Sequence, residues 1–148
     1  MAKPYAGGCA CGAIRYEIDA EPMMAGHCAC RDCQRMTGTG HASMMMFPLA
    51  AMKITGTPRF HDLRADSGNT ASRGFCPNCG SFVMGKNSGM DGVRAIAVGS
   101  LDDPSAFRPQ FIVFASRCHA WDRIDPALPS FPGMPPMGGA PSKQGENA

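Results

Sequence analysis

Three cysteine clusters constrain this chain more than any other feature. They hold seven of its eight cysteines, in the segments Cys9-Ala10-Cys11, Cys28-Ala29-Cys30-Arg31-Asp32-Cys33 and Cys76-Pro77-Asn78-Cys79. Thiolates one or two residues apart can converge on one metal ion, whereas two cysteines separated by a single residue can close only a strained disulfide ring. The spacing therefore favours zinc over disulfides.

The third cluster indicates a structural zinc site. Cys76-Pro77-Asn78-Cys79-Gly80 has the form of a zinc knuckle, in which the proline shapes a tight turn and the glycine lets the backbone pass under the metal. One knuckle supplies two ligands, and Cys9-Ala10-Cys11, which is flanked by glycines, can supply the other two. We therefore expect a structural Zn²⁺ bound by Cys9, Cys11, Cys76 and Cys79.

The remaining cluster supplies three ligands, which leaves a coordination position for water or substrate, as in catalytic zinc sites. We therefore expect a second, catalytic Zn²⁺ at Cys28, Cys30 and Cys33. A histidine as fourth ligand would make this site structural instead. His27 would point to the opposite face of a strand from Cys28, so His41 and His119 are the alternatives. Cys118 is more typical of a small core residue.

Length and composition indicate one globular domain without a membrane span. The chain has 148 residues, of which 18% are charged and 44% are apolar, and no apolar run is long enough to cross a bilayer. The first residues lack the apolar stretch of a signal peptide, so we expect a cytoplasmic protein with reduced thiols.

The net charge gives no reason to expect nucleic acid as a partner. The formal charge is +2, but seven thiolates holding two Zn²⁺ ions would bring it to −1. A nearly neutral protein has no general attraction for phosphates. The residues do not define an oligomeric state, and a homodimer is compatible with them.

Short alternating segments predict a mainly β fold. Ile14, Tyr16 and Ile18 would share the buried face of a strand over residues 13–19. The same reasoning predicts strands at residues 41–47, 52–55, 59–63, 70–75, 81–84, 93–99 and 110–115. A single short helix is expected over residues 31–36, with Gly38 ending it in a left-handed conformation.

The C-terminal segment has a different composition. From Ser130 the chain is rich in proline and glycine and then polar, so it cannot bury enough apolar surface to order itself. We therefore expect one zinc-stabilised domain over residues 1–130 and a flexible, disordered tail over residues 131–148.

Several motifs together resemble a known family. Cys9-Ala10-Cys11-Gly12 precedes a strand, the CxCxxC cluster runs into Gln34-Arg35-Met36-Thr37-Gly38, and Phe75 precedes the knuckle. Residues 109–121 and 128–131 also look like a closing strand and segment. This order is similar to the glutathione-dependent formaldehyde-activating enzyme family, which includes centromere protein V, from about Tyr5 to Phe131.

The resemblance implies a β-sandwich of the kind found in a zinc-containing Rab chaperone, with two Zn²⁺ ions. It implies a structural site at Cys9, Cys11, Cys76 and Cys79 and a catalytic site at Cys28, Cys30 and Cys33. The implied activity is the condensation of glutathione with formaldehyde to S-(hydroxymethyl)glutathione, which is classed as a carbon-sulfur lyase in the reverse sense. The expected partner is thus a small thiol such as glutathione. The competing hypothesis is a non-catalytic zinc module that binds a protein.

Overall fold

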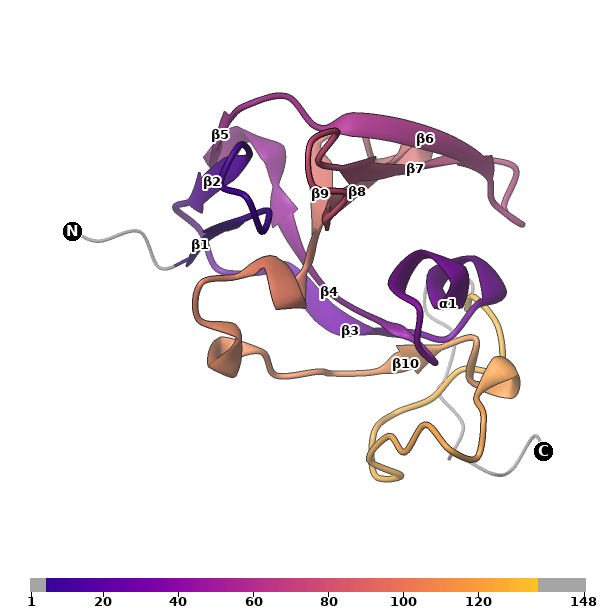
Figure 1. Cartoon of the computed structure of the whole chain (residues 1–148). Coiled ribbons are helices and arrows are strands. Elements are labelled where there is room, and N and C mark those ends of the chain that lie inside the picture. Colours follow the sequence, from indigo (N-terminus) through magenta and orange to yellow (C-terminus); the bar gives the residue numbers. More distant parts are fainter. Residues whose placement is uncertain (1–4, 136–148) are drawn as a thin grey trace. The chain divides into compact units, whose positions relative to one another are not determined.

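A computed structural model of the chain describes residues 5–135 (Figure 1). Strands make up most of its regular structure, and α1 (Arg31–Thr37) is the sole α-helix in that range. The expectation of a mainly β fold with one short helix is therefore confirmed. The finer likeness to the Rab chaperone fold and the organisation as a single domain stay predictions. Internal contacts divide the chain into two compact units.

The first unit holds the described residues up to Met24 together with Met45–Phe107. Its smaller sheet has the order β1-β2-β5 and is antiparallel, formed by β1 (Tyr5–Gly8), β2 (Arg15–Ile18) and β5 (Met52–Thr55). Tyr16 and Ile18 on β2 are 1% and 0% exposed, while Arg15 and Glu17 face solvent. The alternation seen in the sequence therefore places one face of β2 in the core.

A four-stranded antiparallel meander supplies most of the other strands of this unit. It runs in the order β9-β8-β7-β6, with bounds β6 (Arg59–Arg64), β7 (Thr70–Phe75), β8 (Phe82–Asn87) and β9 (Val93–Ala97). Short 3₁₀ turns connect these elements: η1 (Leu49–Ala51), η2 (Ser88–Met90), η3 (Val98–Ser100) and η4 (Pro104–Ala106). The turn between β7 and β8 carries Cys76 and Cys79, so the pairing of these two strands positions both cysteines.

The second unit consists of Ala25–Met44 and the residues from Arg108 onward. Most of β3 (Met24–Cys28) and the first part of β4 (Ala42–Pro48) belong to it, and β10 (Ile112–Val113) pairs with β3 in parallel. The 3₁₀ turn η5 (Ala115–Arg117) follows β10. Ile112 is fully buried, and the backbone amide of Ala29 continues the pairing by donating to Val113 O at 3.0 Å.

Local capping explains where α1 begins and ends. Cys30 is its N-cap residue, and the Cys33 amide donates to the Cys30 sulfur. At the other end Gly38 has φ 76° and its amide donates to Gln34 O at 2.8 Å, which confirms the expected left-handed C-cap.

The pattern analysis assigned no bounds to two strands that contain glycine, which has low strand propensity. These are β1 and β3, where the partners of each strand occupy the space that a side chain would need. A Cβ on Gly7 would meet Leu101 Cα at 2.8 Å, and one on Gly26 would meet the Phe111 ring at 2.5 Å. Conversely, the segment predicted as a strand over residues 110–115 pairs only at Ile112 and Val113.

Residues just beyond Ser130 are hydrogen-bonded into the second unit. The Phe131 amide donates to Ile112 O at 2.9 Å, and the Ser116 hydroxyl donates to Pro132 O at 2.6 Å. These bonds continue the ordered chain past the predicted boundary of the tail. Residues 136–148, the rest of that predicted tail, lie outside the described residues.

Candidate metal centres

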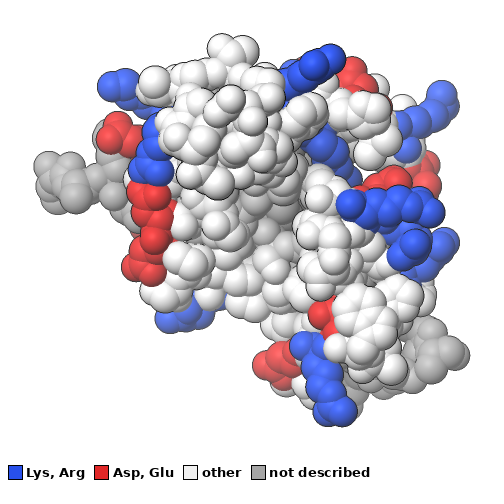
Figure 2. All heavy atoms as spheres, viewed as in Figure 1, with Lys and Arg blue, Asp and Glu red and all other residues white. Residues whose placement is uncertain are grey.

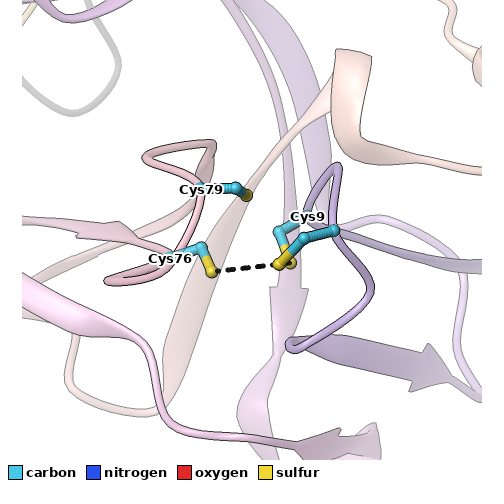
Figure 3. Close-up of side chains that lie close together, drawn as sticks. Cys9, Cys76 and Cys79 are labelled. Carbon is cyan, nitrogen blue, oxygen red and sulfur yellow. Dashed lines mark hydrogen bonds between the residues drawn. The ribbon is translucent and has the colours of Figure 1, made fainter.

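Four cysteine sulfurs meet in the first unit. Cys9 and Cys11 lie in the loop between β1 and β2, and Cys76 and Cys79 lie in the knuckle between β7 and β8. All four sulfur atoms lie within 4.8 Å of one another. Figure 3 shows Cys9, Cys76 and Cys79 extending from these loops toward a common point. Residues nearly seventy positions apart thus form one group that could hold a tetrahedral metal ion.

Backbone turns and hydrogen bonds orient these sulfurs. Gly80 has φ 78°, and its amide donates to Cys76 O at 2.8 Å, so a residue with a side chain would be strained there. The Ile14 amide donates to the Cys9 sulfur at 3.2 Å, and the Asn78 side-chain amide donates to the Cys11 sulfur at 3.2 Å. Such donors stabilise thiolates, which is the protonation state that a metal requires.

Ser81 has a particular role at Cys79. Its hydroxyl accepts from the Ala10 amide at 3.1 Å and lies 3.2 Å from the Cys79 sulfur. The Ser81 hydroxyl, followed by its backbone amide, lowers the pKa of Cys79 to about 5. These contacts favour the thiolate form of Cys79, which is the form that binds a metal ion. Sequence reasoning did not identify Ser81, although its position directly after the knuckle glycine was visible.

Three further sulfurs meet in the second unit. Cys28 ends β3, Cys30 caps α1 and Cys33 lies in its first turn, and their sulfur atoms all lie within 4.8 Å of one another. The sulfurs of Cys30 and Cys33, and then burial, raise the pKa of Cys28 far above its usual range. Three crowded thiolates are costly without a cation, so this set of donors fits a divalent, thiophilic ion such as Zn²⁺.

No histidine or carboxylate of residues 5–135 joins either sulfur group. His27 Nδ1 lies 2.9 Å from Ser43 Oγ, and His41 Nδ1 lies 2.6 Å from Asp122 Oδ2. His119 Nε2 lies 3.0 Å from Gln34 Oε1. Burial, and then His41, lowers the pKa of His27 to about 4, so this ring is neutral at physiological pH. Cys118 is also outside both groups.

The second unit also contains a cavity of about 340 Å³. Its lining includes His27, His41, Arg108, Arg123 and Leu128. Consecutive strand residues point to opposite faces, so His27 and Cys28 place the cavity and the three sulfurs on opposite faces of β3. The cavity is large enough for a small molecule.

Charge on the molecular surface is mixed. Figure 2 shows Lys and Arg interspersed with Asp and Glu, and among the residues described on that face no wide area carries Lys and Arg alone. Arg15 and Asp102 form a two-point ion pair at 2.8 and 2.5 Å, which shows how closely opposite charges are paired. This distribution agrees with the low net charge inferred from the sequence.

The fold and the two sulfur groups together define a mainly β protein with two sites that could hold zinc. The chain belongs to the glutathione-dependent formaldehyde-activating enzyme family, whose model matches residues 4–117. The resemblance inferred from the cysteine motifs is thereby confirmed. The matched region includes all seven clustered cysteines.

The chain is also similar to a solved protein structure. A crystal structure of a Rhodobacter sphaeroides protein from a structural genomics programme has a TM-score of 0.52 and 20% sequence identity, covering 66% of this chain and 87% of that chain. This likeness shows a shared fold. No curated protein matches the chain. In the described part of the chain, no helix is both long and apolar enough to cross a membrane.

Proposed function

We propose that this protein is a zinc-dependent enzyme of the carbon-sulfur lyase type that forms or cleaves thiol–aldehyde adducts, as an S-(hydroxymethyl)glutathione synthase does. The observation that carries the proposal is the presence of two different sulfur groups, one of four atoms and one of three. Four sulfurs complete a structural site, whereas three leave a position for a substrate atom. Family membership supports a reaction of glutathione with formaldehyde or a related pair.

The proposed reaction is an addition without oxidation or reduction. The S–H bond of the thiol breaks, a bond forms between sulfur and the aldehyde carbon, and the former carbonyl oxygen takes up a proton. Zn²⁺ held by Cys28, Cys30 and Cys33 would lower the pKa of a substrate thiol and keep its sulfur nucleophilic. Three thiolate ligands reduce the ability of the ion to lower the pKa of a bound water. The centre therefore suits thiol chemistry better than hydrolysis.

The chain contributes a rigid arrangement of the three cysteines. Cys33 is 4% exposed and is held in the first turn of α1. Cys30 is fixed by the cap that it forms with Cys33, and Cys28 is anchored where β3 pairs with Val113. A fixed site of this kind holds a small reactant in one orientation, which lowers the entropic cost of bringing it to its partner.

Exchange NMR tests the activity directly. Glutathione and formaldehyde form their adduct spontaneously in buffer, and we expect the zinc-loaded protein to speed the exchange between free and adduct signals. Equal exchange with and without protein would reject the glutathione version. Repeating the measurement with cysteine and with a thiol that lacks carboxylates would show which thiol class is accepted.

The competing hypothesis is a zinc module that binds another protein without catalysis. It predicts that no thiol–aldehyde pair exchanges faster and that loss of the three-sulfur site unfolds the protein. A cytoplasmic location and a small thiol as partner remain part of the proposal.

A further inference from the structure

Cys28, Cys30 and Cys33 form the cysteine triplet. Gln34 directly follows Cys33 and is one of the buried polar residues of the described chain. Its side chain is 5% exposed, within a short helix that is otherwise mostly solvent-facing. The side-chain nitrogen donates to Ala29 O at 2.8 Å and to Arg117 O at 3.1 Å. The side-chain oxygen accepts from Arg31 Nη1 and lies 3.0 Å from His119 Nε2. The amide thus has all four of its hydrogen-bonding positions filled.

The chemistry of these partners fixes the orientation of the amide. Two of them are backbone carbonyls, which can only accept, and Arg31 can only donate. Turning the amide over would place its oxygen against the Ala29 and Arg117 carbonyls and its nitrogen against a guanidinium. The oxygen of Gln34 must therefore face His119.

This orientation also determines which nitrogen of His119 carries hydrogen. Because Gln34 Oε1 is an acceptor, His119 Nε2 must be a donor, so the neutral ring is the Nε2–H tautomer. The ring is further held by Trp121, whose plane is tilted by 5° from it at a centroid distance of 5.2 Å. His119 Nε2 is therefore excluded as the fourth ligand of a metal ion bound by the neighbouring cysteines.

The four partners of Gln34 lie on the two chain segments around the triplet. Ala29 separates Cys28 from Cys30, and its carbonyl is held by Gln34 five residues later. Arg117 and His119 belong to the segment after β10, more than eighty residues away. One amide therefore ties the backbone between two of the cysteines both to α1 and to the C-terminal segment.

We infer that Gln34 is a positioning residue for the cysteine triplet. Its side chain holds Cys28, Cys30 and Cys33 in their ligand geometry and keeps His119 as its Nε2–H tautomer. The inference deepens the proposed function and rests on it insofar as the triplet binds a metal. Partners that orient metal ligands from outside the coordination sphere typically contribute 10–100-fold to metal affinity.

The His119 tautomer can be tested in the unmodified protein. Nitrogen-15 correlation spectra of its histidines distinguish the two neutral tautomers, and we expect His119 to show hydrogen on Nε2. Hydrogen on Nδ1 would overturn the assigned network. This measurement requires neither a variant nor catalytic activity.

The positioning role is tested by Gln34→Met, with Gln110→Met as the matched control. Gln110 lies in the same unit, and its side-chain oxygen also holds a backbone group, the Ala25 amide at 3.0 Å, but it has no bond to α1. With Co²⁺ as the probe metal, we expect Gln34→Met to weaken binding at the triplet by about 10–100-fold and to shift the thiolate–cobalt absorption bands. Gln110→Met should leave both unchanged.

The outcomes separate this inference from the proposed function. Unchanged affinity and bands in Gln34→Met would overturn the positioning role, even in an active enzyme. Failure of the wild-type triplet to bind Co²⁺ or Zn²⁺ would overturn both. If wild-type protein binds metal as expected but does not accelerate thiol–aldehyde exchange, the proposed function falls and the positioning role stands. Gln34→Glu, which keeps the side-chain shape but places an oxygen against two carbonyls, should reproduce the loss.

Discussion

The backbone amide of Cys33 donates a hydrogen bond to the sulfur of Cys30, with 3.3 Å between the two atoms. Cys30 is therefore both a candidate metal ligand and the N-cap of α1. A serine oxygen serves equally well as a helix cap but poorly as a zinc ligand. This double role allows the metal site to be separated from the fold.

We expect Cys30→Ser to stay folded, to lose one of two zinc equivalents and to lose accelerated adduct exchange. Cys30→Ala removes the cap as well and should be about 1 kcal/mol less stable than the serine variant. Metal analysis and urea unfolding of both variants measure these effects. Two zinc equivalents retained by Cys30→Ser would contradict the assignment of the triplet.

The four-sulfur group should be essential to folding. Cys76 is fully buried, and structural zinc sites contribute on the order of 10 kcal/mol in small domains. We expect Cys76→Ser to unfold the first unit, as seen by loss of dispersed amide signals. Cys118→Ser is the control, since Cys118 lies outside both sulfur groups, and it should remain folded with two zinc equivalents. A folded Cys76→Ser protein would show that this site is dispensable.

Tyr16 should make stability fall at high pH. Burial raises its pKa to about 12, whereas tyrosine in an unfolded chain has a pKa of about 10. The folded state thus holds the proton more tightly, and its contribution is complete below pH 10 and is lost as pH rises toward 12. The expected loss is roughly 2–3 kcal/mol.

Tyr16→Phe isolates this effect from the titration of the cysteines. The variant loses the hydrogen bond between the hydroxyl and Ser100 Oγ, which measures 2.7 Å, at a cost of about 1 kcal/mol near neutral pH. The advantage of wild type in unfolding free energy should fall as pH rises above 10 and change sign as pH approaches 12, because the expected loss of roughly 2–3 kcal/mol exceeds the value of the hydrogen bond. A difference that is independent of pH would refute the role of Tyr16.

Gly40 should tolerate no side chain. It is buried, and a Cβ there would overlap the carboxylate of Asp122, which holds His41 Nδ1 at 2.6 Å. We expect Gly40→Ala to lose about 1–3 kcal/mol of stability through the displaced Asp122. Gly99→Ala is the control, because its Cβ would have no neighbour within 4 Å, and it should stay within about 0.5 kcal/mol of wild type. Equal stability of the two variants would contradict the packing at Asp122.

Strands with alternating side chains could be predicted, since one buried face leaves a clear period of two. β5 and β7 have the predicted bounds, and α1 extends one residue beyond the predicted end. The strands β1 and β3, which contain glycine, could not be given bounds this way. Their side chains carry little pattern, and their pairing depends on neighbours such as Leu101 and Phe111 that approach from distant parts of the chain.

The sequence alone indicated which cysteines act together within each cluster, because cysteines one to three residues apart are brought together by local turns. That the two pairs meet in one group of four depends on tertiary structure, because they lie nearly seventy positions apart. The sequence also predicted the left-handed Gly38 that ends α1, because this cap depends on adjacent residues. Only the tertiary structure decided that Gln34 meets His119 and that Asp122 contacts His41. Those pairs are more than eighty residues apart, so their contacts follow from strand pairing and packing, which no local spacing records.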